Sequence, residues 1–530
     1  MAQLSPLAGP SPANLVSFFR AGAGLWRRIQ ALARGPAPPL ALIIPIGLVV
    51  LAALGPLMSN RLHRDEAIYS SWGLDIASGR DILVSGSAVD KPPLFLYVQA
   101  LSFLLFGSSE VAARLPSLVA TVVSVGLIFE LGRSLYSRDL GLLAALLWAA
   151  SPFTILFAPT AFTDPMMVMW MLAGCAAAVH GRWAWAGIWL GLAAITKPQG
   201  AFFAPLALGL GQVAQGKSPR RASQAVLLVA AFLSVFGLAL LWDVARARQP
   251  GFLAQAVVNY GRLPLSWSTA WQHWLGLVSL LRYGTASRVL NGALLVGLPL
   301  LLAADVVLLR DPAKASDTRF GQAGKPYQAQ ADLVITVFIA LFLVGHSLVV
   351  FAMWDRYLLG LIPWLALLLA RVLTLPLRLL QNWSPGRVLG LVFVLGMLAF
   401  TLGPIRDAAA SRFPIGGDHG AYQGIEQIVN FFQAVPADTT VYHRWLGWHW
   451  RFYLWGSPYD FRAWTSPGDL AAQAAARPGA RRYVVFPSWQ SSSEARLALA
   501  DAGLAMREVQ RAYRGDGSVS FILYRIEEAL

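Results

Sequence analysis

The loop that follows the first long apolar run holds residue types suited to proton transfer and to binding an anion. Asp65 and Glu66 open this loop, and Lys91 follows, directly before two prolines. The run before it, residues 40–58, contains no charged side chain. A carboxylate can act as a general base, and a fixed cation stabilises negative charge that grows on a leaving group. The loop is therefore where the sequence predicts chemistry on an anionic, lipid-linked substrate at a membrane edge.

The composition is that of an integral membrane protein. The chain has 530 residues, of which 56% are hydrophobic and only 13% charged, and its mean hydropathy is +0.55. Soluble domains average about 25% charged residues, which excludes a soluble protein. Much of the net charge of +15 lies in short loops between apolar runs, a pattern that indicates membrane orientation rather than nucleic-acid binding. Cys175, the only cysteine, excludes a disulfide within the chain and is expected to be buried and inert.

About eleven apolar runs approach or reach the roughly 17–21 residues that a ~30 Å hydrocarbon core requires, and several of them are short. We predict membrane-spanning helices at residues 40–58, 115–132, 140–157, 165–180, 183–196, 201–215, 224–242, 290–309, 332–353, 357–373 and 388–404. The first run is too long for a signal-peptide core and is kept as a permanent helix. Together these runs define a transmembrane domain over residues 40–404.

The distribution of basic residues predicts the orientation. The N-terminal tail, residues 1–39, has four arginines and no acidic residue, so we expect it to be cytoplasmic. Alternate loops further along are also rich in Lys and Arg. The loop 243–289 is arginine-rich although it falls on the outside, but loops of that length are weakly governed by the charge rule. We therefore predict a multi-pass protein of the plasma (inner) membrane.

Residues 405–530 form a segment of different composition, with charges throughout and no apolar run long enough to span a bilayer. Residues 426–434 and 494–502 are predicted to be helices. Residues 440–443, 483–486 and 519–524 are rich in β-branched and aromatic residues and are predicted to be strands. The segment is thus expected to be a small α/β domain. An odd number of spans places it outside the cytoplasm, on the same side as Asp65.

With this topology, the unusual polar residues gather on the outer face. The first outer loop contains Asp65, Glu66 and Lys91, and later outer loops or span ends contain Asp164, Lys197, Asp355 and Arg356. Ionisable residues at a membrane edge are costly and mark functional sites by default. Their convergence on one face is stronger evidence than any single residue.

Each of these residues also has a simpler interpretation. Asp65 and Glu66 suit the first turn of a helix, and Asp164 between a threonine and a proline suits a helix start. Lys197 fits an interfacial lysine that reaches toward water. Asp355 and Arg356 fit a surface ion pair. Lys91 is the hardest to explain structurally, because a stiff extended segment holds it where no helix needs a cation.

Histidines and tryptophans provide further candidates. His346 lies inside an apolar run, and a hydrogen-bonded structural role is expected for it. Trp267, Trp271 and Trp274 have the spacing of a helix that lies in the membrane interface. Further tryptophans of the C-terminal segment suit interfacial or core packing, or stacking on sugar rings; they are Trp445, Trp448, Trp450 and Trp455. The histidines have no recognisable zinc spacing, so no metal site is assigned; a divalent metal cofactor stays open.

Several of these blocks resemble a known family. Asp65-Glu66-x-x-Tyr69 followed by Lys91-Pro92-Pro93 resembles the membrane glycosyltransferases that use polyprenyl-phosphate sugars. That group includes the dolichyl-phosphate-mannose protein mannosyltransferases and the bacterial lipid A aminoarabinose transferases. The segment that ends in Thr196-Lys197 and the block that starts at Arg356-Tyr357 are similar to two further motifs of the family. The resemblance covers roughly residues 40–404.

The resemblance implies a GT-C fold, a helical bundle with an active site in an outward cavity under the first loop. It implies that Asp65 is the base, with Glu66 beside it, and that Lys91 lies near the donor phosphate. Cations in a water-poor cavity stabilise the charge that grows on the leaving phosphate, which suits Lys91, Lys197 and Arg356, and we expect Tyr69, Asp164 and Tyr357 to contact substrate. The histidine that often follows the Asp-Glu pair in protein mannosyltransferases is replaced here by Ile68, which favours a bacterial-type enzyme.

The predicted function is therefore transfer of a sugar from a polyprenyl-phosphate donor to a lipid, glycan or protein hydroxyl, with inversion at the anomeric carbon. The sequence leaves the sugar and the acceptor open. A transporter or lipid flippase is the alternative, but transporters usually place polar sites near the midplane of repeated halves, and no repeat is visible here. A non-catalytic assembly partner is a third interpretation.

Overall fold

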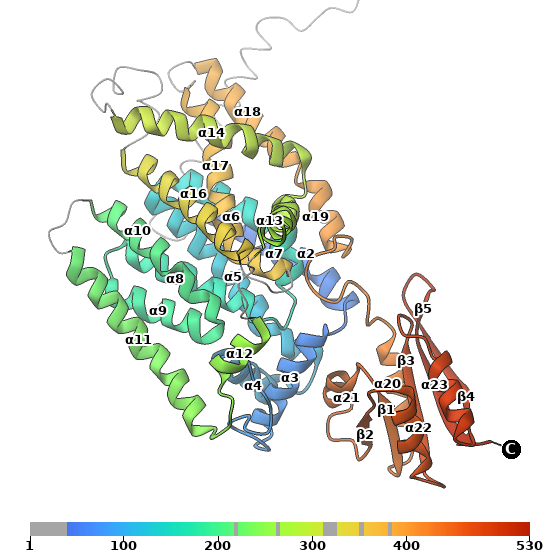
Figure 1. Ribbon diagram of the computed structural model, residues 1–530. Helices are drawn as coiled ribbons and strands as arrows, with labels where there is room; N and C mark the ends of the chain where they lie inside the picture. The colour runs from blue at the N-terminus through green and yellow to red at the C-terminus, as the bar shows by residue number, and fades with distance from the viewer. Residues whose placement is uncertain are drawn as a thin grey trace, which may run out of the picture.

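The computed structural model describes residues 40–529, apart from 217–220, 261–265, 311–325, 349–353 and 380–383. The predicted tail, residues 1–39, and the end of the predicted span 332–353 therefore lie outside the described residues. The described chain consists of a large helical body and a smaller C-terminal domain with a β-sheet (Figure 1).

The helical body is built from α-helices joined by short 3₁₀ turns. Its α-helices are α2 (Ile43–Ser59), α3 (Arg64–Ala77), α4 (Leu94–Phe106), α5 (Glu110–Leu135), α6 (Arg138–Ala149), α7 (Pro152–Phe157), α8 (Asp164–Val179), α9 (Trp183–Thr196), α10 (Ala204–Gln215), α11 (Arg221–Ala245), α12 (Phe252–Tyr260), α13 (Trp267–Leu281), α14 (Arg288–Arg310), α16 (Pro326–Ser347), α17 (Ile362–Leu379), α18 (Ser384–Ala399) and α19 (Leu402–Ala409). The 3₁₀ turns are η1 (Leu40–Leu42), η2 (Pro198–Phe203), η3 (Arg282–Gly284) and η5 (Asp355–Leu361).

Seven helical segments within the described residues are long and apolar enough to cross a membrane by themselves. They are Leu40–Ser59, Glu110–Leu135, Arg221–Ala245, Arg288–Arg310, Pro326–Ser347, Asp355–Arg378 and Val388–Ala409. The other four predicted spans coincide with shorter or broken helices, namely α6 with α7, α8, α9, and η2 with α10. The prediction of a polytopic helical protein is thus confirmed, whereas the count of eleven spans stays a prediction.

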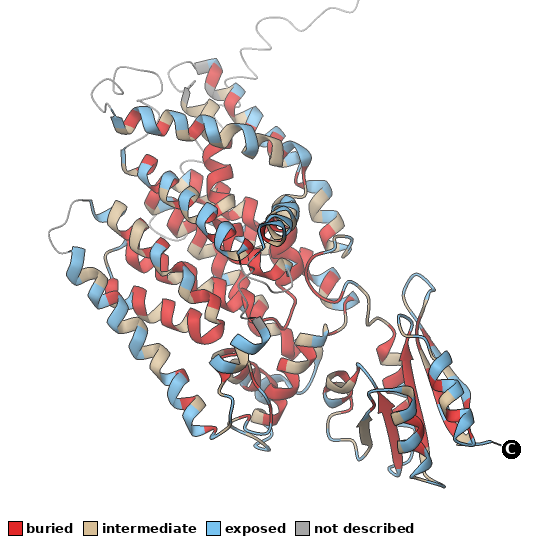
Figure 2. Ribbon diagram, viewed as in Figure 1, coloured by how far each residue is buried: buried red, intermediate tan, exposed pale blue. Residues whose placement is uncertain are grey.

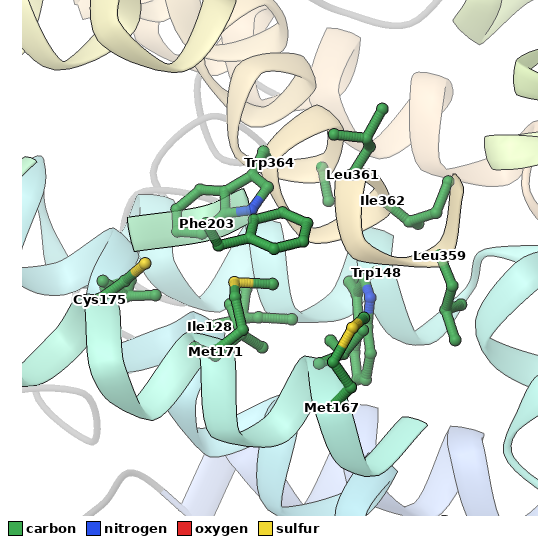
Figure 3. Close-up of a cluster of buried hydrophobic side chains, with 14 of the residues drawn as sticks. Ile128, Trp148, Met167, Met171, Cys175, Phe203, Leu359, Leu361, Ile362 and Trp364 are labelled. Carbon is green, nitrogen blue, oxygen red and sulfur yellow. The ribbon is translucent and has the colours of Figure 1, made fainter. Parts of the chain in front are cut away.

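The interior of the body is a continuous apolar core. Trp364 of α17, Met171 and Cys175 of α8, and Phe203 of η2 are buried together in it (Figure 3). Of the 18-residue apolar stretch within Asp355–Arg378, 83% is buried, against 11% of the corresponding stretch within Arg221–Ala245. α17 is therefore a central helix, and α11 lies at the edge with large apolar side chains exposed (Figure 2). Such a surface suits contact with lipid.

Two glycines allow α5 and α6 to approach each other closely. A Cβ atom placed on Gly132 would lie 2.5 Å from the Cα atom of Gly141, and one on Gly141 would lie 2.5 Å from the carbonyl oxygen of Phe129. Neither position has room for a side chain without moving backbone. The contact fixes α5, whose first turn contributes to the candidate site below.

The C-terminal domain contains a five-stranded sheet in the order β2-β1-β3-β5-β4. Its strands are β1 (Thr439–His443), β2 (Asp460–Ala463), β3 (Arg481–Pro487), β4 (Leu504–Tyr513) and β5 (Val519–Glu528). β1 pairs in parallel with β2 and β3, and β5 pairs antiparallel with β3 and β4. The helices are α20 (Ile425–Gln433), α21 (Gly447–Tyr453), α22 (Pro467–Ala475) and α23 (Ser493–Asp501). The predicted small α/β domain is present.

Helix α21 joins this domain to the helical body beside α3. The Nε2 atom of His449 lies 3.0 Å from the carbonyl oxygen of Leu62. The Tyr453 hydroxyl donates to Glu110 at 2.7 Å, and Arg451 forms an ion pair with Asp75. The C-terminal domain therefore lies against the loop region that contains Asp65.

Candidate functional site

The first turn of α3 is fixed by a reciprocal capping arrangement. His63 is the N-cap residue, and its Nδ1 atom accepts a hydrogen bond from the backbone N–H of Asp65 at 3.2 Å. The Glu66 carboxylate in turn accepts from the backbone N–H of His63 at 2.8 Å. A capping box of this kind satisfies N–H groups that a helix start leaves without partners. It fixes the backbone of the Asp65 position.

Glu66 is fully buried and held by several groups. Its second carboxylate oxygen accepts from the backbone N–H of Ala161 at 2.6 Å and lies 3.3 Å from Nε of Arg114. Arg114 also donates to the carbonyl oxygen of Asn60 at 2.9 Å. These contacts fit the simpler interpretation of Glu66, that of a residue that opens and ties down a helix.

Asp65 lies beside the guanidinium of Arg356, with 2.7 Å between its Oδ2 and Nη1 of the arginine. The Asp65 side chain is 26% exposed and that of Arg356 7% exposed. The Asp355 carboxylate accepts hydrogen bonds from the backbone N–H of Arg356 at 2.8 Å and from the backbone N–H of Gly416 at 2.6 Å. The surface ion pair between Asp355 and Arg356 that the sequence allowed is thus replaced by a pairing of Arg356 with Asp65.

The surroundings keep Asp65 ionised. Burial by itself raises the pKa of the carboxyl, but the charge of Arg356, the neighbouring His63 and the hydrogen bond from Arg356 outweigh burial. The pKa of Asp65 is consequently below its ordinary value. Asp65 is therefore a deprotonated carboxylate at neutral pH, the state that a proton acceptor needs.

Two lysines bring further positive charge to this centre. Lys91 is 5% exposed, and its Nζ lies 2.7 Å from Oδ2 of Asp90. Burial lowers the pKa of Lys91, although Asp90 opposes this. The charges of Arg356 and Asp65 also act on Lys91, so the Lys-Pro-Pro segment reaches the same centre as α3 and η5.

Lys197 follows the end of α9 and is 7% exposed. Its Nζ lies 2.5 Å from Oδ1 of Asp164, the first residue of α8, and 4.7 Å from the ring centroid of Tyr357. Lys197 is thus a buried, paired cation, and the interpretation as a lysine that reaches toward water is wrong. A role at the helix start does not explain the ion pair of Asp164 with Lys197. Thr163, the N-cap residue of α8, makes no capping hydrogen bond with its side chain.

Aromatic rings that the sequence did not single out surround Arg356. The guanidinium lies 5.1 Å from the ring centroid of Phe162 and 5.3 Å from that of Trp354. Phe162 lies two residues before Asp164, and Trp354 lies two residues before Arg356. This proximity is the only signal that the sequence offers for the two rings. Tyr69 is buried on α3 and acts electrostatically on Arg356. Aromatic faces attract cations and exclude water from them.

His346 has the structural role that was expected. Its Nε2 lies 3.1 Å from Nε2 of Gln199, and its Nδ1 lies 3.0 Å from the carbonyl oxygen of Phe342. Gln199 also donates to the carbonyl oxygen of Tyr357 at 3.0 Å. These bonds connect η2, α16 and η5, the segments that hold Lys197 and Arg356 in place.

The structure therefore gathers three buried cations and one partly exposed carboxylate from four separate segments. Lys91, Lys197 and Arg356 are each paired with a carboxylate, and they still act on one another electrostatically. A guanidinium carries five N–H donors, so Arg356 can hold Asp65 and an anionic ligand together. Among the described residues, no group of three or more His, Cys, Asp and Glu side chains could hold a metal ion.

Comparison with known proteins finds sequence similarity over part of the chain. Residues 90–242 match the family model described as dolichyl-phosphate-mannose-protein mannosyltransferase. The match spans Lys91, Asp164 and Lys197. YycA of Bacillus subtilis (strain 168), provisionally named a mannosyltransferase, is 29% identical over 165 residues, which are 30% of this chain and 24% of YycA. The chain thus matches about a quarter of the length of that relative.

Two solved structures of ArnT from Cupriavidus metallidurans are similar over nearly the whole chain. The structure bound to undecaprenyl phosphate has a TM-score of 0.60 at 15% identity, covering 91% of this chain and 97% of ArnT. The apo structure has a TM-score of 0.61 at 14% identity, covering 95% and 98%. At sequence identities this low, the structural similarity shows a shared fold and nothing further. The chain therefore has the GT-C fold and resembles the polyprenyl-phosphate-sugar-dependent membrane glycosyltransferases, as its motifs predict.

Proposed function

We propose that this chain transfers a sugar from a polyprenyl-phosphate donor to a hydroxyl group of an acceptor, in one displacement step that inverts the anomeric carbon. The observation that carries the proposal is the ion pair between Asp65 and Arg356, set among two further buried cations. It combines a deprotonated carboxylate with a site for an anionic leaving group.

In this reaction Asp65 is the general base. It takes the proton from the acceptor hydroxyl as the hydroxyl oxygen attacks the anomeric carbon of the donor. The bond between that carbon and the phosphate oxygen breaks at the same time. Asp65 suits the role because it is ionised and partly exposed, whereas the oxygens of Glu66 already have partners.

The cations stabilise the departing lipid phosphate. Negative charge grows on the phosphate oxygen as the glycosidic bond breaks, and fixed cations in a water-poor setting stabilise that charge most. We assign this role to Lys91, Lys197 and Arg356, with Tyr69, Asp164 and Tyr357 lining the substrate site. The similarity of the fold to an ArnT structure bound to undecaprenyl phosphate supports a polyprenyl-phosphate ligand here.

The test is the Asp65→Asn variant. Asparagine keeps the shape of the side chain and removes its proton affinity, and loss of a general base typically costs about 10²–10⁴-fold in rate. We expect a fall of that size in the transfer of labelled sugar from a polyprenyl-phosphate donor by the purified full-length protein.

Donor binding separates a chemical defect from a folding defect. The variant should bind unlabelled polyprenyl phosphate and unfold at a temperature close to that of the wild type. Near wild-type turnover in well-folded Asp65→Asn protein would remove Asp65 from the base position. Absence of any transfer by the wild type, with donor binding intact, would remove the enzyme assignment.

A further inference from the structure

A polar cavity lies where the C-terminal domain meets the helical body. It has a volume of about 540 Å³, within the range of roughly 300–1,000 Å³ that small-molecule sites occupy. The helical body contributes Asp75, at the end of α3, and Arg80. The C-terminal domain contributes Trp448, Arg451 and Trp455, among others. The cavity is separate from the Asp65 centre, since Asp65 and Asp75 lie roughly 15 Å apart along α3 at 1.5 Å per residue.

Indole rings and guanidinium groups alternate around this cavity. The guanidinium of Arg80 lies 4.4 Å from the ring centroid of Trp455, and that of Arg451 lies 5.3 Å from the ring centroid of Trp448. Arg451 is also paired with Asp75, which leaves one net positive charge among these side chains. Flat apolar faces next to planar polar groups are suited to a sugar, which has apolar C–H faces and a rim of hydroxyls.

Two enclosed polar atoms of the lining have no hydrogen-bond partner among the described residues. They are Nδ1 of His443 and the hydroxyl of Ser457. His443 is only 8% exposed, and burial lowers its pKa to about 4, so its imidazole is neutral at pH 7. A neutral imidazole offers one donor and one acceptor, and so does a sugar hydroxyl. Buried polar groups normally have partners, so these two atoms have unused hydrogen-bonding capacity in the wall of the cavity.

A row of side chains connects the cavity with the reactive carboxylate. Asp65, Tyr69 and Trp72 follow the i, i+4, i+7 spacing that places residues on one face of α3. The ring centroids of Tyr69 and Trp72 are 6.0 Å apart, and those of Trp72 and Trp448 are 5.9 Å apart. Trp448 then lines the cavity. Tyr69 and Trp72 are only 4% and 3% exposed, so this row is packed interior that connects the wall of the cavity with the helix face of Asp65.

We propose that the cavity between α3 and α21 is a saccharide-binding subsite, which holds the glycan part of the acceptor. The inference rests on the proposed glycosyl transfer only in calling the ligand an acceptor. Binding of the saccharide does not require that the reaction takes place. The ligand is a neutral or singly acidic oligosaccharide, in accordance with the single net positive charge of the lining.

The experiment is a binding assay with the full-length protein in lipid nanodiscs. The protein is applied to an array of neutral and singly acidic oligosaccharides and, in parallel, to an array of peptides rich in serine and threonine. We expect retention on a subset of the oligosaccharides. In Trp455→Ala the affinity for that subset should fall about tenfold, which corresponds to about 1.4 kcal/mol, and Trp455→Phe should recover most of it.

Trp489→Ala is the matched control, because Trp489 is an exposed indole of the same domain that is absent from the cavity lining. It should bind oligosaccharides as the wild type does. Retention on peptides alone, no retention on any oligosaccharide, or equal losses in Trp455→Ala and Trp489→Ala would each overturn the subsite. Failure of sugar transfer with oligosaccharide binding intact would instead count against the proposed reaction.

Discussion

Arg356 is the residue on which the chemistry of the candidate site depends most. It is bound to Asp65, acts on Lys91 and Lys197, and is enclosed by aromatic rings. In the proposed reaction it binds the donor phosphate and keeps the base ionised at once, because its planar fork has donors for two anions. Lysine, a compact point charge, would perform the electrostatic part of this role but lose the geometry.

The pH profile of the reaction should reveal this coupling. Asp65 must be deprotonated to act, and its pKa is below the ordinary value because of Arg356. Activity should therefore persist as the pH falls until the lowered pKa of Asp65 is reached. In Arg356→Gln the burial remains and the cation is lost, so the pKa of Asp65 should rise and the acidic limb of kcat/KM should move to higher pH. Arg356→Lys should keep the limb near its wild-type position.

The measurement normalises each variant to its own maximum, because Arg356→Gln also weakens donor binding. An acidic limb at the same pH in the wild type and in Arg356→Gln would mean that the limb belongs to another group, and that Arg356 acts on the donor alone.

Helix α3 is the element that connects the parts of the site. Its first turn carries Asp65, its buried face carries Glu66, and its last turn carries Asp75, which contacts the C-terminal domain. The helix is anchored by the ion pair between Glu66 and Arg114, both of which are buried. An element fixed at both ends in this way can hold a base and a distant subsite in constant register.

Glu66→Ala should therefore impair folding before it impairs chemistry. Removing one partner of a buried ion pair typically costs about 3–5 kcal/mol, and here the N–H groups of His63 and Ala161 also lose their acceptor. We expect a clear fall in the unfolding temperature in detergent. Glu508→Ala, which breaks the exposed pair with Arg511, should change stability by about 0–1 kcal/mol. A stable but inactive Glu66→Ala protein would return Glu66 to the reacting groups.

The whole molecule places the C-terminal domain and the Asp65 loop on one side of the helical body, through the contacts of α21 with α3. The charge rule applied to the basic loops predicts that the opposite side faces the cytoplasm. A reporter that is active only outside the cytoplasm should therefore be active when it is fused after Leu530. It should be silent when it is fused after Arg310, the end of α14. The reverse pattern would invert the topology and move the site to the inner face.

The sequence by itself determined the class of protein, most of the helices and the residue types of the site. Hydropathy and charge report directly on which segments enter lipid, and alternation reports on strands. Asp65, Lys91, Asp164, Lys197 and Arg356 were identified because charges are rare in such a chain. Strand β4 and helix α4, in contrast, were not predicted, since β4 alternates weakly and α4 is too short to stand out as a span.

Only the tertiary structure decided which charges meet. Arg356 pairs with Asp65 instead of its neighbour Asp355, and Glu66 becomes an anchor through Arg114 and Ala161. Partners of this kind come from helices that are distant in sequence, and local periodicity specifies which face of a helix is buried without specifying what it is buried against. The cavity between α3 and α21 is likewise formed by two domains that the sequence describes only separately.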